Sequence, residues 1–172
     1  MASGATGRIE RLPAVEQVRQ LPCFHRAEIT PDHLDAMGHM NIRWYMALYD
    51  EAAWAFFAAF GMDERYFRER RSGGFALQHY IHYLAEVRLG DRVAVHARLL
   101  GYSAKRIHYM AFMVNETQQR LASLVEALGA HADMETRRLS PFPPDLAENL
   151  ARLLERDKAV GWEAPISGAM QP

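Results

Sequence analysis

The stretch that decides the fold is residues 35–61, which read DAMGHMNIRWYMALYDEAAWAFFAAFG. From Ile42 to Phe60 nearly every position is apolar, and the run predicts a helix. Asn41, just before it, has a short side-chain oxygen that can accept a hydrogen bond from an amide of the first turn. Gly61 supplies the stop. A helix with so little polar surface is expected to be buried on every side.

After this helix the apolar period changes from 3.6 to 2, which is typical of strands. Strands are predicted over residues 75–89, 93–101, 107–113 and 121–135, with a turn at Gly90-Asp91 and a hairpin loop over residues 115–120. The charged residues 63–71 predict one or two helical turns, which end at Ser72-Gly73-Gly74. Short turns between the last four strands favour an antiparallel meander.

Two further segments complete the order of elements. Residues 23–30 have the length of a strand that Pro31 ends. Near the C-terminus, Asp145 and Glu148 resemble a capping pair for a closing helix with one apolar stripe, made of Leu146, Leu150, Leu153 and Leu154. The order predicts an α+β fold in which a curved antiparallel sheet covers the buried helix. Such a sheet covers one side well, so a partner subunit is expected on another.

The composition predicts one domain in three parts. The 172 residues divide into an N-terminal arm (1–22), a domain (23–142) and a C-terminal helix and tail (143–172), and the arm is expected to be loosely held. Twenty basic and twenty-one acidic residues leave a net charge of −1, which gives no overall field for nucleic acid or an anionic membrane.

A cytoplasmic location is expected because the sequence shows neither a secretory signal nor an apolar run long enough to span a membrane. Met1–Glu10 lacks the basic-then-apolar order of a secretory signal, and the uninterrupted apolar run Ala52–Met62 is too short to span a bilayer. The single cysteine, Cys23, allows no internal disulfide, and no zinc-type spacing occurs. No metal is therefore expected.

The densest group of chemically active residues lies in the loop that leads into the helix. Asp35, His39 and Asn41 place a carboxylate, an imidazole and an amide within seven residues, and Gly38 permits a positive φ. Free amides at a helix start can polarise a carbonyl oxygen, and a nearby carboxylate can attack that carbonyl or activate water. The pattern favours acyl transfer. The alternative from composition alone is an ordinary turn, with Asn41 only as a cap. Without a Gly-x-Ser-x-Gly motif, a serine triad is not expected.

A family resemblance extends this hypothesis. The motif Asp-x-x-Gly-His-x-Asn at 35–41, followed by Tyr45, a long apolar helix and Gly-Asp at 90–91, resembles hotdog-fold acyl-CoA thioesterases of the 4-hydroxybenzoyl-CoA thioesterase-like group. The resemblance covers about residues 23–142. It implies a hotdog fold and hydrolysis of an acyl-CoA thioester to free acid and coenzyme A.

The resemblance also implies roles for single residues. Asp35 would be the nucleophile or the general base, with His39 and Asn41 orienting water or the carboxylate, and the amides of Asn41 and Ile42 would bind the thioester oxygen. Substrate binding is assigned to Gly38, Tyr45, His79 and Tyr80. Glu51, inside the helix, is a reserve candidate for the carboxylate.

Two adjacent cations are the candidates for binding coenzyme A. Lys105 and Arg106 start a strand after a turn, where hotdog thioesterases commonly meet the phosphates of coenzyme A. Arg offers a planar fork and Lys a point charge, both suited to phosphate. The alternative is a solvated hairpin end. Coenzyme A would enter as part of the substrate, and no separate cofactor is expected.

A narrower resemblance concerns the substrate. Residues 86–91, 104–108, 126 and 131–133 are similar to the thioesterases of carnitine breakdown, which act on betainyl-CoA. A trimethylammonium group would need an aromatic cage, for which the candidate walls are Trp44, Trp54, Tyr80 and Tyr83, although such aromatics also fill cores. Betainyl-CoA or another short acyl-CoA is the substrate class considered.

The resemblance also implies a homodimer or homotetramer with the active site at the subunit interface. Two alternatives to a thioesterase stay open at this point. One is a non-catalytic acyl-CoA-binding hotdog module, which would bind tightly without turnover. The other is a hotdog dehydratase or hydratase, whose usual loop pattern ending in Pro-Gly is absent here.

Overall fold

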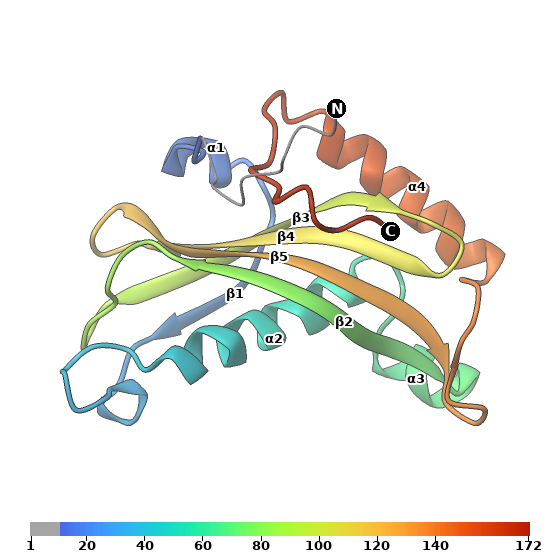
Figure 1. Ribbon diagram of the computed structural model, residues 1–172, viewed down its shortest axis with the longest axis horizontal. Coiled ribbons are helices and arrows are strands. Elements are labelled where there is room, and N and C mark those ends of the chain that lie inside the picture. Colours follow the sequence, from blue (N-terminus) through green and yellow to red (C-terminus); the bar gives the residue numbers. More distant parts are fainter. Residues whose placement is uncertain (1–10) are drawn as a thin grey trace, which may run out of the picture.

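A curled antiparallel sheet lies against one long helix (Figure 1). The computed structural model describes residues 11–172, so the prediction made from Met1–Glu10 lies outside the described residues. The strands are β1 Cys23–Glu28, β2 Ser72–Tyr83, β3 Arg92–Tyr102, β4 Arg106–Asn115, β5 Arg120–Asp133 and β6 Arg138–Leu139. The helices are α1 Val15–Val18, the 3-10 turn η1 Pro31–His33, α2 Ile42–Ala58, α3 Glu64–Arg70 and α4 Pro144–Lys158. The α+β fold class is confirmed.

The strand order is β1-β3-β4-β5-β2, with β6 paired to β5 and every pair antiparallel. The predicted meander is therefore wrong for β2, which pairs with β5 and not with β3. β2 ends at Tyr83 and not at Leu89. The link over residues 84–91 is long enough to leave one edge of the sheet and cross to β3, so Gly90-Asp91 ends a crossing and not a hairpin. One edge of β2 is unpaired within residues 11–172.

Helix α2 begins as predicted. The Asn41 side chain accepts a 3.1 Å hydrogen bond from the Arg43 amide. Five residues of α2 are buried against the sheet: Tyr45, Leu48, Tyr49, Ala52 and Phe56. The other side is open, with Ile42 67% and Trp54 55% exposed. The sheet therefore curls around only part of α2 in a single chain, as expected from the sequence, and the partner subunit expected on the open side stays a prediction.

The N-terminal arm is not loosely held where the structure describes it. Val18 and Leu21 are buried in a cluster with Met110, Phe112 and Leu124, on the sheet face opposite α2. Burial of these side chains gives residues 11–22 a fixed place in the domain.

The closing helix α4 forms with its predicted apolar stripe, and Leu146, Leu150 and Leu153 are buried. Its predicted capping pair is wrong. The cap position is Pro143, which has no side-chain cap, and Asp145 instead lies 3.2 Å from Arg70 of α3. Within residues 11–172, no helix is both long and apolar enough to cross a membrane.

The end of α4 and the segment after it are held on the face opposite α2 by buried polar groups. Arg98 donates to the carbonyl oxygens of Asp157 and Trp162, at 2.7 and 2.9 Å. Glu126, which is 1% exposed, lies 2.7 Å from His108 and accepts a hydrogen bond from the Ser167 amide. These partners offset part of the cost of burying the charged groups, although Nε of Arg98 has no hydrogen-bond partner.

Candidate active site

The loop before α2 is a tight turn fixed by its own backbone. The Asp35 amide donates to the His39 carbonyl at 3.0 Å, and the Gly38 amide donates to the Asp35 carbonyl at 3.0 Å. Gly38 has a φ of 82°, a backbone conformation that residues with a side chain rarely adopt. The spacing Asp-x-x-Gly-His therefore closes a turn that holds the first and last residues together.

The turn brings Asp35 and His39 side by side. Oδ1 of Asp35 accepts a 2.8 Å hydrogen bond from the Met37 amide, and Oδ2 lies 3.4 Å from Nδ1 of His39. The Asp35 side chain is 18% exposed, so water can reach it. On its other side, His39 Nε2 lies 3.9 Å from Glu86 of the crossing link.

Asn41 acts as the helix cap, and its amide is occupied. The Asn41 amide donates to the His33 carbonyl at 2.9 Å, so the prediction that it binds the thioester oxygen is wrong. The extended backbone of a cap residue directs that amide back toward η1. The Asn41 side chain takes the Arg43 amide, which leaves the Ile42 amide as the group a ligand could meet at the start of α2.

The crossing link supports this loop from behind. The Met40 amide donates to the Val87 carbonyl at 2.7 Å. The link is itself fixed by the buried Asp91 carboxylate, which accepts from the Arg88 amide at 2.9 Å and from Asn115 at 2.7 Å. Gly90 has a φ of 76°. The Gly-Asp pair thus anchors the link against which the Asp35 loop lies.

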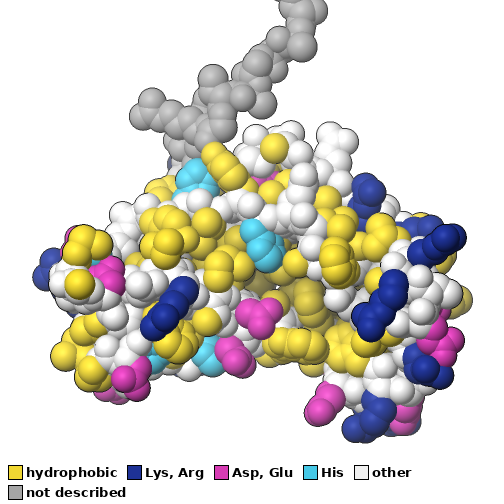
Figure 2. Space-filling view, turned by 60° about the horizontal axis from the view of Figure 1, so that its bottom comes forward, with side chains coloured by type: hydrophobic (Ala, Val, Ile, Leu, Met, Phe, Trp, Pro, Cys, Tyr) yellow, Lys and Arg dark blue, Asp and Glu magenta, His cyan; other side chains and the backbone are white. Residues whose placement is uncertain are grey.

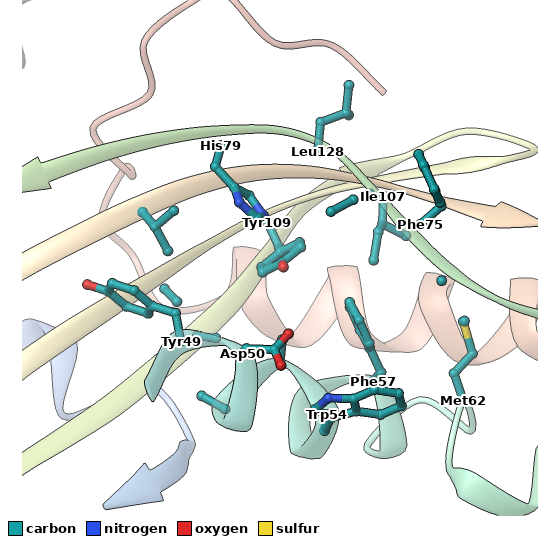
Figure 3. Close-up of a pocket in the computed structure, with 18 of the residues that line it drawn as sticks. Tyr49, Asp50, Trp54, Phe57, Met62, Phe75, His79, Ile107, Tyr109 and Leu128 are labelled. Atoms are coloured by element: carbon teal, nitrogen blue, oxygen red, sulfur yellow. The ribbon is translucent and has the colours of Figure 1, made fainter. Parts of the chain in front are cut away.

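A cavity of about 160 Å³ opens between α2 and the strands β2, β4 and β5. Figure 2 shows a hollow with hydrophobic walls and with acidic and histidine side chains at its mouth. Asp50 of α2 points into the cavity, and His79 of β2 lies across from it (Figure 3). Burial lowers the pKa of His79. His79, which is assigned to substrate binding from the sequence, therefore lines the cavity.

Sequence reasoning did not single out Asp50 as a cavity residue, although a pattern marks it. Met46, Ala53, Trp54 and Phe57 line the same cavity and lie at −4, +3, +4 and +7 from Asp50. These spacings put all of them on one helical face. An acidic residue within an apolar helical stripe is the pattern that marks Asp50 as a cavity residue. Asp50 and Glu51, the reserve carboxylate, are both exposed in the single chain, but Glu51 is not part of the cavity wall.

Other predicted substrate-binding residues lie away from this cavity. The Tyr45 hydroxyl donates to the Ala85 carbonyl at 3.4 Å, and burial raises its pKa. Tyr80 follows His79 and so faces the opposite side of β2, where its ring packs edge-on against His82. Neither lines the cavity, and Gly38 belongs to the loop turn.

Of the four candidate cage walls, Trp54 alone lines the cavity. Trp44 instead donates through Nε1 to the Asp32 carbonyl at 3.1 Å, and Tyr83 packs edge-on against Tyr45 with ring centres 5.1 Å apart. The cage predicted from the sequence is therefore not assembled from these residues within one chain.

Lys105 and Arg106 are exposed beside one end of the cavity. Lys105 Nζ donates to the Leu139 carbonyl at 3.4 Å, and Arg106 pairs in register with Ala130, which lines the cavity. The Asp35 loop lies at the opposite end of α2 (Figure 1). The two predicted parts of the site are thus separated within one chain. Residues 11–172 contain no group of three or more His, Cys, Asp or Glu side chains that could hold a metal ion.

The comparison with known families agrees with this architecture. The family model described as the Thioesterase-like superfamily matches residues 29–150. The chain belongs to this superfamily. The match takes in the loop, α2, the cavity strands and the first half of α4 of this thioesterase-like chain.

Two relatives are named for the same activity. The betainyl-CoA thioesterase of Pseudomonas aeruginosa is 28% identical over 145 residues, covering 82% of this chain and 89% of that protein. The L-carnitine dehydrogenase/betainyl-CoA thioesterase of Agrobacterium fabrum is 31% identical over 130 residues, covering 76% of this chain and 26% of that protein. The thioesterase-like chain thus spans about a quarter of the length of the two-activity relative.

Solved structures confirm the hotdog fold. A Staphylococcus aureus protein in complex with CoA has a TM-score of 0.78 at 22% identity, covering 88% of this chain and 95% of that chain. The 1,4-dihydroxy-2-naphthoyl-CoA thioesterase of Synechocystis has a TM-score of 0.66 at 14% identity, covering 77% of this chain and 98% of that chain.

Proposed function

We propose that this thioesterase-like chain hydrolyses an acyl-CoA thioester to a free acid and coenzyme A, with Asp35 as the reacting carboxylate. The observation that carries the proposal is the Asp35–His39 pair, at 3.4 Å, beside the start of α2. The Ile42 amide and the positive end of the helix would stabilise the negative charge that develops on the thioester oxygen.

Two routes fit a carboxylate at this place. In one, an Asp35 oxygen bonds to the carbonyl carbon, the carbon–sulfur bond breaks, and water then hydrolyses the anhydride. In the other, Asp35 takes a proton from water as that water attacks the carbonyl carbon. In both routes the coenzyme A thiolate leaves and takes up a proton. Neither route needs a cofactor or a metal ion.

The proposed site is completed by a second copy of the chain. β2 is a long edge strand with exposed apolar residues, among them Phe75 and Tyr83. Such edges pair readily with another strand. Antiparallel pairing of β2 with its copy would put the Ser72 end of one protomer beside the Tyr83 end of the other. The cavity of one protomer would then face the Asp35 loop of its partner, in a homodimer or in a homotetramer built from such dimers.

The substrate proposed is betainyl-CoA or another short acyl-CoA. The named activity of the relatives from P. aeruginosa and A. fabrum supports it. Lys105 and Arg106 would bind the phosphates of coenzyme A, which arrives as part of the substrate. The cytoplasmic location expected from the sequence stays a prediction.

The test is a hydrolysis screen of the full chain over acetyl-, betainyl-, benzoyl- and palmitoyl-CoA, with released thiol and free acid measured together. Equal amounts of thiol and acid from a short acyl-CoA are expected. Tight binding of acyl-CoA with no thiol released from any member would support a non-catalytic binding module. An enoyl-CoA and a 3-hydroxyacyl-CoA are assayed beside the panel. Addition of water to the double bond of the enoyl-CoA, or loss of water from the 3-hydroxyacyl-CoA, without thiol release would support a hydratase or dehydratase.

A further inference from the structure

The cavity beside α2 combines one carboxylate with aromatic walls. Asp50 points into it from the helix, with Trp54 and Phe57 beside the carboxylate and Tyr109 across from it (Figure 3). Phe75 closes one side from β2. Most of the remaining wall is aliphatic.

The charge of the cavity is not balanced by the protein. The lining contains no lysine or arginine, and within residues 11–172 the exposed Asp50 carboxylate has no hydrogen-bond or ion-pair partner. His79 is the basic group of the lining. Burial lowers its pKa, although the Asp50 carboxylate acts in the other direction, so the neutral ring predominates at pH 7. The Tyr109 hydroxyl is also neutral, because burial raises its pKa. A ligand in the cavity therefore meets one negative charge.

This combination suits a cation more than a neutral group. Aromatic faces attract quaternary ammonium groups through the negative charge of the ring face, and a carboxylate adds direct attraction. A neutral group of the same shape would gain the apolar contact but would leave the Asp50 carboxylate without a partner and partly desolvated. We propose that Asp50, with Trp54 as its aromatic neighbour, is the specificity determinant that selects a cationic acyl group for hydrolysis.

This inference rests on the proposed function, and on its two-chain site in particular. Asp50 lies eight residues after Ile42, which is about 12 Å along an α-helix. A short acyl group whose carbonyl is held at Ile42 does not reach Asp50 of the same chain. The cavity would instead receive the acyl group of a thioester held by the partner's loop.

The test compares two thioesters of nearly the same shape. Betainyl-CoA carries a trimethylammonium group, and tert-butylacetyl-CoA carries an uncharged tert-butyl group in its place. We expect the wild type to prefer betainyl-CoA in kcat/KM. Asp50→Asn should lower kcat/KM for betainyl-CoA by about 10- to 100-fold and leave the value for tert-butylacetyl-CoA nearly unchanged.

Two further variants sharpen the comparison. Trp54→Leu keeps an apolar wall but removes the ring face, and it should also lower the preference for the cation. Glu148→Gln removes the same charge from an exposed position on α4 and should leave both values unchanged. Circular dichroism and thermal unfolding would establish that all variants are folded.

The possible failures are distinguishable. If Asp50→Asn lowered kcat/KM equally for both thioesters, Asp50 would act in catalysis or folding. That result would overturn its role in specificity but not the proposed thioesterase activity. An unchanged preference in that variant would overturn it as well. If the folded wild type hydrolyses neither thioester nor any member of the wider screen, the proposed function fails and this inference fails with it.

Discussion

Oδ2 of Asp35 lies 3.4 Å from Nδ1 of His39, while Oδ1 of the same carboxylate is held by the Met37 amide. One oxygen is therefore fixed by the backbone, and the other faces an imidazole beside the start of α2. This arrangement keeps a carboxylate oriented without burying it, since the side chain is 18% exposed. A nucleophile or general base that must meet water or a thioester needs both properties.

Asp35→Asn should abolish thioester hydrolysis while leaving the fold and coenzyme A binding largely intact. The amide can still accept from Met37, but it can neither attack the carbonyl nor take a proton from water. We expect kcat to fall by about 100-fold or more. The matched control is Asp32→Asn, an exposed acid of the neighbouring turn η1. Full activity of Asp35→Asn would remove the central claim.

The local elements of the fold could be predicted from the sequence because their causes are local. Asn41 caps α2, and the period-2 pattern gives the concave faces of β3 and β4. The place of β2 could not be predicted in this way. Its pairing with β5 joins residues such as Tyr80 and Glu126, far apart in the chain, and depends on how the 84–91 link crosses the curled sheet.

Lys105 and Arg106 should matter more for coenzyme A thioesters than for pantetheine thioesters. Replacing both by Ala should raise KM for an acyl-CoA by about tenfold, because a charged hydrogen bond to phosphate is lost. KM for the matching acyl-pantetheine, which lacks the nucleotide phosphates, should change little. Replacing the exposed Arg68 and Lys158 by Ala is the control, with no effect expected on either substrate. Equal effects on both substrates would argue against phosphate contact.

The site could be predicted only where it is contiguous in the chain. Asp35 and His39 are four residues apart, so one turn brings them together, and a motif can reveal them. The cavity draws its walls from α2, β2, β4 and β5, and no spacing in the sequence shows that Asp50 faces Tyr109 across it. The helical stripe around Asp50 gives its face but not its opposite wall.

Because of His96, the free energy of unfolding should fall in mild acid. Burial lowers its pKa in the folded chain, although its Nδ1 hydrogen bond of 2.9 Å to the Leu21 carbonyl acts in the other direction. The unfolded chain, with a histidine pKa of about 6.5, takes up a proton first, so the free energy of unfolding falls as the pH drops below that value. His96→Asn keeps a donor for Leu21 but does not titrate. Urea unfolding at several pH values should therefore show a smaller decline for the variant, and parallel curves would contradict the prediction.

Mixed dimers test whether two chains share one active site. Asp35→Asn removes the reacting carboxylate, and Ala76→Trp fills the cavity from β2, so each variant alone should be inactive. In a mixed dimer, one site would combine the native Asp35 of one protomer with the native cavity of its partner. Random exchange after mild denaturation and refolding should then restore about a quarter of the wild-type activity, because half of the dimers are mixed and each has one complete site. Light scattering should show the same dimer or tetramer mass for each variant and for the mixture. If each chain held a complete site of its own, every chain in the mixture would carry one damaged part, and no activity would return.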